Sequence, residues 1–231
     1  MFTLDEVVPW GRSFDEYRRM FALTERELGL TVVDCGSGPA SFNAEATRRG
    51  GHIVSCDPIY RWSTDQIQER IASTCGKVLD QTRRNRDEFV WDSIQSVEVL
   101  GELRMTAMRA FLDDYASGKA VGRYVDAALP TLPFADASFD LALCSHFLFL
   151  YSAQLVDGFH QSAIREMCRV ATEVRIFPLV TLDAKRSQYV DQIMDECPRW
   201  GVEASIERVP YEFQRGANAM MRIRPAGQKV E

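Results

Sequence analysis

The sequence lacks the features that usually mark export, membrane insertion and structural metal sites. It has six cysteines and three histidines, but no Cys-x-x-Cys pair and no histidine cluster at metal-ligand spacing. No apolar run approaches the roughly 18 residues that a membrane span needs. The acidic segment from Met1 to Pro9 has neither the basic start nor the apolar centre of a signal peptide. We therefore expect reduced thiols, no metal, no membrane span and a cytoplasmic location.

Positive charge is also scarce. The net charge is −6 and the sequence pI is about 5.2, which argues against a broad basic surface and makes a nucleic-acid partner unlikely. Hydrophobic residues make up 46% and charged residues 26% of the chain, as is usual for a globular protein. At 231 residues, one domain over 1–231 with a local elaboration is the expected organisation.

The first quarter of the chain has the pattern of a βαβ unit. Apolar residues at helical spacing predict a helix over 14–28, and a β-branched run predicts a strand over 30–34. A Gly-rich turn follows, then a helix over 44–49 and a second strand over 52–57. This order is typical of an open parallel sheet.

The pattern then becomes helical over residues 63–117. A simple crossover needs only about a dozen residues, so we expect a helical insertion between strands two and three. Beyond it, the sequence predicts strands at 123–126, 139–144 and 173–180, helices at 156–169 and 186–196, and paired strands at 203–209 and 219–223.

A Gly-x-Gly turn preceded by an acid follows the first strand. Val33 and Asp34 end the strand, and Gly36 and Gly38 form the turn. A dinucleotide site asks for a third glycine where this chain has Ser41, and a carboxylate at position 34 would repel a pyrophosphate. The same carboxylate would attract an ammonium group.

A second acid closes the next strand. Asp57 lies 19 residues after Gly38, where a carboxylate can accept hydrogen bonds from both hydroxyls of a ribose. Enzymes that use NAD share this feature, so a nicotinamide-dependent oxidoreductase remains an alternative on this evidence.

Taken in order, these motifs resemble a class I, seven-stranded S-adenosylmethionine-dependent methyltransferase over roughly residues 30–180. The matching segments are Asp34-Cys35-Gly36-Ser37-Gly38, Asp57-Pro58-Ile59, the stretch from Leu132 to Leu143, and Ile164 to Ala171. The resemblance implies a Rossmann-like α/β fold: an open sheet, mostly parallel with an antiparallel C-terminal strand, and helices on both faces. The usual Pro-Gly-Gly turn before strand five is replaced by Thr172-Glu173.

The resemblance also assigns roles to residues. Asp34 would lie near the methionine amino group of the cofactor, Gly36 and Gly38 would let the backbone approach it, and Asp57 would hold its ribose. The remaining positions are Pro58, Ile59 and the backbone of Leu129 around the adenine, and Ser145 and His146 near the transferred methyl group.

Three features have two interpretations each. His146 is either a general base or a histidine merely hydrogen-bonded at a strand end. The aromatic residues of 147–151, with Tyr60 and Trp62, either line an acceptor pocket or pack in the core. Arg12, before the first helix, either pairs with the cofactor carboxylate or belongs to a plain surface helix.

The sequence thus predicts methyl transfer from S-adenosylmethionine to a small-molecule acceptor, with the 63–117 insertion closing the acceptor site. No Asn-Pro-Pro-aromatic tetrad follows strand four, which disfavours amino-methylation of nucleobases or glutamine. A nicotinamide-dependent oxidoreductase and a non-catalytic S-adenosylmethionine-binding module are the alternatives, and a protein acceptor stays open.

Overall fold

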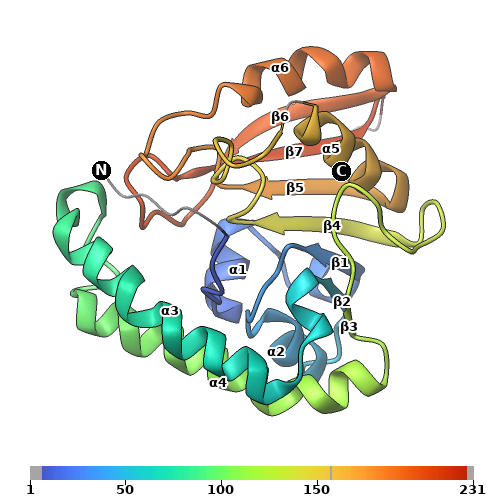
Figure 1. Cartoon of the computed structure of the whole chain (residues 1–231). Helices are drawn as coiled ribbons and strands as arrows, with labels where there is room; N and C mark the ends of the chain where they lie inside the picture. Colours follow the sequence, from blue (N-terminus) through green and yellow to red (C-terminus); the bar gives the residue numbers. More distant parts are fainter. Residues whose placement is uncertain (1–6, 157, 228–231) are drawn as a thin grey trace.

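The fold is built on a seven-stranded sheet with the strand order β3-β2-β1-β4-β5-β7-β6 (Figure 1). The structure is a computed structural model that describes residues 7–156 and 158–227. The strands are β1 (Thr31–Cys35), β2 (His52–Cys56), β3 (Tyr124–Val125), β4 (Phe139–Ser145), β5 (Ala171–Phe177), β6 (Val202–Arg208) and β7 (Ala219–Pro225). Strand β7 runs antiparallel to both of its neighbours, and the remaining pairs are parallel. The predicted Rossmann-like open sheet, mostly parallel with an antiparallel C-terminal strand, is therefore confirmed.

Helices cover both faces of this sheet. They are α1 (Phe14–Met20), α2 (Phe42–Arg48), α3 (Thr64–Arg84), α4 (Val97–Ala120), α5 (Phe159–Val170) and α6 (Tyr189–Glu196). Consecutive side chains along a strand point to opposite faces of the sheet. Val32 packs in one core with Phe14 and Phe42, whereas Val33 packs in the other core with Ile164 of α5. Both faces are thus buried, as a parallel sheet requires.

Two predicted elements have different ends in the structure. The opening helix stops at Met20, because Thr24 and Glu27 exchange hydrogen bonds and begin a separate short 3-10 helix. Strand β5 ends at Phe177 rather than at 180, since Pro178 has no N–H to continue the ladder.

Between β2 and β3 the chain forms α3 and α4, which lie side by side as a long pair below the sheet in Figure 1. Ser63 caps the start of α3 and Ser96 caps the start of α4, each accepting a backbone N–H. An aromatic cluster of Tyr60, Phe111 and Tyr124 fixes this pair against the edge of the sheet. Within the described residues, no helix is both long and apolar enough to cross a membrane.

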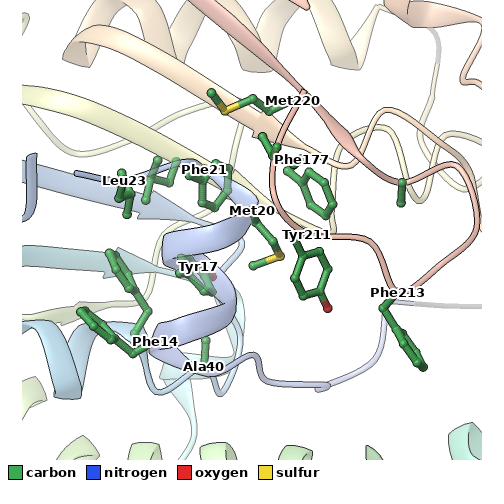
Figure 2. Close-up of a cluster of buried hydrophobic side chains, with 14 of the residues drawn as sticks. Phe14, Tyr17, Met20, Phe21, Leu23, Ala40, Phe177, Tyr211, Phe213 and Met220 are labelled. Atoms are coloured by element: carbon green, nitrogen blue, oxygen red, sulfur yellow. The ribbon is translucent and has the colours of Figure 1, made fainter. Parts of the chain in front are cut away.

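A buried ion pair ties the helical pair to the rest of the molecule. Arg104 of α4 donates to both carboxylate oxygens of Glu16 in α1, at 2.5 and 2.7 Å, and both side chains are fully buried. Tyr211, in the β6–β7 connection, donates to the same carboxylate at 2.8 Å. Figure 2 shows Tyr211 beside Met20 of α1, so three segments distant in the sequence meet at one point.

Burial alone would raise the pKa of Glu16, but the charge and hydrogen bonds of Arg104 lower that pKa to about 2. The carboxylate therefore remains ionised at neutral pH. The pair holds α1, α4 and the β6–β7 connection in a fixed relation around the carboxyl end of β1.

Candidate functional site

The Gly-rich turn lies at the carboxyl end of β1, in the middle of the sheet. Gly36 and Gly38 have φ values of +67° and +54°, a conformation that costs little only for glycine. The N–H of Gly36 donates to the carbonyl of Cys56 at 2.8 Å, which joins this turn to the end of β2. A hydrogen bond to the neighbouring strand thus fixes the position of the turn.

Asp57 directly follows β2, and its carboxylate points toward that turn. Its Oδ2 accepts the N–H of Gly38 at 2.8 Å, and its Oδ1 accepts the N–H of Ile59 at 2.8 Å. Each carboxylate oxygen can accept a further hydrogen bond, so the group is fixed in place with capacity left for a ligand. Burial raises the pKa of Asp57, and the two backbone N–H groups oppose that shift.

Asp34 is a buried carboxyl group with one satisfied oxygen and one unsatisfied oxygen. Tyr17 donates its hydroxyl to Oδ2 at 3.0 Å, whereas Oδ1 is buried without a hydrogen-bond partner. Burial raises the pKa of Asp34 to about 8, the Tyr17 hydrogen bond opposes the shift and the charge of Asp57 adds to it. An unsatisfied buried oxygen is costly, so this position favours a ligand that brings a donor or a positive charge.

Ser145 and His146 lie at the carboxyl end of β4, next to β1. Ser145 Oγ is 2.9 Å from Nδ1 of His146, and the backbone N–H of His146 donates to the carbonyl of Phe177 at 2.6 Å. Burial lowers the pKa of His146 well below its usual range, and the charges of Arg12 and Arg104 lower it further. The imidazole is therefore neutral at pH 7.

Two adjoining pockets open over these strand ends. Pocket A is lined by the chain before α1, the turn after β1, the end of β4, helices α3 and α4, and the β6–β7 connection. Pocket B is lined by the same chain before α1, the turn after β2, part of α3 and the segment 127–129. Gly36, Gly38, Asp57 and Phe147 line both, so the pockets meet at the Gly-rich turn.

The predicted site residues lie around these two pockets. Ser145 and His146 line pocket A, whereas Pro58, Ile59 and Leu129 line pocket B. Asp34 lines neither pocket, but its partner Tyr17 lines pocket A.

The aromatic candidates divide between pocket and core. Phe147 and Tyr151 line pocket A, whereas Phe149 is buried in the core beneath α5. Tyr60 is fully buried and donates to the carbonyl of Gly38 at 2.7 Å, so it supports the turn from behind. Tyr17 is buried against Asp34, which rules out a plain surface helix for α1.

Sequence reasoning missed the far wall of pocket A. Val78 and Thr82 of α3, Leu100 and Arg104 of α4, and Phe213 contribute to it. No local motif marks these residues, because they reach the pocket only through tertiary packing. A helical insertion beside the site was the single available signal.

The comparisons with known proteins place the chain in a family. No protein-family model matches it. Protein MJ0045 of Methanocaldococcus jannaschii, described as uncharacterized, is 34% identical over 226 residues, which cover 96% of this chain and 97% of the relative. The chain belongs to the same family as MJ0045. Common descent with an uncharacterized protein does not assign an activity to this chain.

Solved structures with a similar fold include two methyltransferases. The 1,6-didemethyltoxoflavin-N1-methyltransferase of Burkholderia thailandensis is 12% identical, with a TM-score of 0.48 and coverage of 91% of this chain and 79% of that chain. A TehB-like S-adenosylmethionine-dependent methyltransferase of Corynebacterium glutamicum is 14% identical, with a TM-score of 0.45 and coverage of 91% and 86%. At these identities the likeness is one of fold alone.

Proposed function

We propose that this protein is an S-adenosylmethionine-dependent methyltransferase that acts on a small molecule. The observation that carries the proposal is the buried, unsatisfied Oδ1 of Asp34 directly before the Gly36–Gly38 turn. A dinucleotide would bring a pyrophosphate to this turn, and its negative charge would repel the ionised form of Asp34. An amino acid ammonium group favours that ionised form and supplies a donor to Oδ1.

The surrounding residues fit the rest of the cofactor. Asp57 retains acceptor capacity on both oxygens for two ribose hydroxyls. Pro58, Ile59 and Leu129 offer the apolar walls that a planar base requires, in pocket B next to Asp57. The two pockets meet at the Gly-rich turn, which suits a ligand that extends from one into the other.

When bound, S-adenosylmethionine supplies a methyl group already activated by a sulfonium charge. The protein residues then have to position the acceptor, exclude water and manage one proton. His146 is neutral at pH 7 and lines pocket A, so a ring nitrogen can accept a proton from an acceptor placed there. Its lowered pKa makes it a weak base, and we expect positioning to supply most of the rate.

A small-molecule acceptor is favoured by the shape of pocket A. Helix α4 and the β6–β7 connection are joined to α1 by the buried Glu16–Arg104 pair and by Tyr211. These same segments contribute walls of the pocket, so several elements bound it, as suits a small molecule.

Incubation with S-adenosylmethionine labelled in its methyl group, together with heat-treated cell extract, tests the proposal. We expect label in the small-molecule fraction with the wild-type protein and none with Asp57→Ala. Label in protein or RNA would contradict the small-molecule acceptor. Binding of adenosylhomocysteine without any labelled product would contradict methyl transfer and favour a non-catalytic cofactor-binding module.

A further inference from the structure

Part of the lining of pocket A is an apolar wall. Val78, Leu100, Leu150, Leu182 and Phe213 come from five different segments and all contribute to this wall. Apolar walls of this kind bind a ligand body through area removed from water. The ligand body that fits here is therefore compact and apolar.

The polar side chains of that wall are mostly occupied by partners within the protein. Gln214 donates to the carbonyls of Thr181 and Leu182 at 2.9 and 3.0 Å. Thr82 donates to the carbonyl of Val78 at 2.8 Å. These bonds leave little donor capacity on α3 or on the β6–β7 connection for a ligand.

Arg12 is different. Its Nη1 donates to the backbone carbonyl of Trp10, but its buried Nε has no hydrogen-bond partner. Across residues 7–156 and 158–227, no acidic side chain forms a salt bridge with it. Arg104, the other arginine of pocket A, is paired with Glu16, although its Nε is also unsatisfied. Arg12 thus lines pocket A without an ion-pair partner among the described residues, although the nearby charge of Glu16 raises its pKa against the larger effect of burial.

The charge of Arg12 acts on several groups around pocket A. It lowers the pKa of His146, after the larger effect of burial, and it opposes the rise that burial causes in the pKa of Tyr151 and of Tyr17. The pKa of Asp34 is set by burial, by Tyr17 and by Asp57, with no contribution from Arg12. Burial lowers the pKa of Arg12 to about 10, with Arg104 adding to the shift, so Arg12 remains charged at neutral pH.

We propose that pocket A binds a methyl acceptor with a compact apolar body and a carboxylate group, and that Arg12 pairs with that carboxylate. This inference rests on the proposed methyltransferase function and adds the substrate class to it. Guanidinium and carboxylate match in geometry, because two parallel N–H donors meet two oxygens. A bound carboxylate would also supply an acceptor for the buried Nε of Arg12, whose lack of a partner is unfavourable in the free protein. The assignment makes Arg12 a substrate-binding residue and leaves the cofactor to Asp34 and Asp57.

Calorimetric titration of the adenosylhomocysteine-saturated protein with matched acids and amides tests the inference. The probes are benzoate against benzamide, and phenylacetate against phenylacetamide, since each pair differs almost only in charge. We expect at least one acid to bind about tenfold more tightly than its amide. Equal affinities, or no binding of either acid, would overturn the inference.

Three variants test whether Arg12 is the residue that makes the protein prefer an acid to its amide. Arg12→Met should abolish the preference for the acid while changing the adenosylhomocysteine Kd by less than about threefold, and Arg12→Lys should retain a preference. Arg18→Met is the matched control, because Arg18 pairs with the exposed Glu25 outside the pocket. A loss of adenosylhomocysteine affinity in Arg12→Met would place Arg12 on the cofactor carboxylate and contradict the proposal.

The two proposals fail in different ways. If the wild-type protein does not bind adenosylhomocysteine, the proposed function is wrong, and acid-against-amide titration of the free protein still tests pocket A. If adenosylhomocysteine binds and no acid is preferred, only the substrate class is wrong.

Discussion

The two ends of the site are built in different ways. The proposed cofactor end, around Gly36, Gly38 and Asp57, consists of backbone turns at the carboxyl ends of neighbouring strands, hydrogen-bonded to one another at about 2.8 Å. The proposed acceptor end is assembled from α1, α3, α4 and the β6–β7 connection, and the Glu16–Arg104 pair and Tyr211 join α1, α4 and the connection. The first end follows from the sheet itself. The second can change its shape and charge while the sheet stays the same.

The largest effect is expected at the acceptor end, from Glu16→Gln. The change leaves Arg104 buried without an opposite charge, which typically costs about 3–5 kcal/mol of unfolding free energy. Glutamine at this position can still complete the cap of α1, so the loss reports on the ion pair. Urea unfolding measures it, with Glu25→Gln as the control because Glu25 pairs with Arg18 in solvent.

The same pair predicts an acid-dependent loss of stability. The folded-state pKa of Glu16 is lowered to about 2, so its contribution is present above the unfolded pKa near 4.5 and disappears as the pH falls toward 2. Glu16→Gln should flatten this part of the pH–stability curve. An unchanged curve would show that the pair does not hold the acceptor end together.

The next largest effect is expected at the cofactor end, from Asp57→Ala. It removes two charge-assisted acceptors for the ribose and also frees the N–H groups of Gly38 and Ile59. We expect the adenosylhomocysteine Kd to rise by about 100-fold or more, as measured by calorimetry. Asp195→Ala is the control, since Asp195 is exposed on α6 and lines neither pocket. A similar loss in both variants would contradict the assigned role of Asp57.

Asp34→Asn should change stability and binding in opposite directions. The folded-state pKa of Asp34 is raised to about 8, so the folded protein keeps a proton that the unfolded chain releases near pH 4. Wild-type stability therefore falls as pH rises from about 4 to about 8, and the asparagine variant escapes this loss.

Binding depends on the charged form of Asp34. Wild-type affinity for adenosylhomocysteine should increase with pH, by up to about tenfold per unit below pH 8, because the bound ammonium favours the carboxylate. Asp34→Asn should bind more weakly at pH 8 and show a flat profile. Calorimetry at pH 6, 7 and 8 distinguishes the two proteins, and parallel profiles would refute the assignment.

The smallest of these effects is expected from Gly36→Ala. A Cβ at this position would strain the backbone at φ +67° and lie 3.1 Å from the Phe147 ring. Gly50→Ala is the matched control, with φ +90° and nothing within 4 Å. Both should lose about 1–2 kcal/mol of unfolding free energy, but only Gly36→Ala should also weaken adenosylhomocysteine binding, by about tenfold. Equal adenosylhomocysteine affinity in both variants would contradict a role of the Gly36 turn in cofactor binding.

The difference between the two ends also explains how much the sequence could predict. Asp34, Gly36, Gly38 and Asp57 were found because turn chemistry and strand spacing are local, and parallel strands bring their carboxyl ends to one edge. The order of strands and helices followed from the hydrophobic pattern, whereas the helices on both faces were implied by the resemblance to class I methyltransferases.

Arg104 and the walls of pocket A could not be found in this way. Which face of a helical insertion meets α1 is decided by tertiary packing, and no short segment encodes it. The premature end of α1 has a similar cause, since the capping of Thr24 by Glu27 competes with an otherwise helical pattern. The role of His146 stays a prediction.

The most direct test of the central claim is the thermal unfolding of the wild-type protein with adenosylhomocysteine and, separately, with NAD. A ligand that binds the folded state at about 100 times its Kd adds about 2.7 kcal/mol of stability and raises the Tm. We predict that adenosylhomocysteine raises the Tm and that Asp57→Ala abolishes the rise, while NAD leaves the Tm unchanged. A rise with NAD and none with adenosylhomocysteine would contradict the account and favour an oxidoreductase.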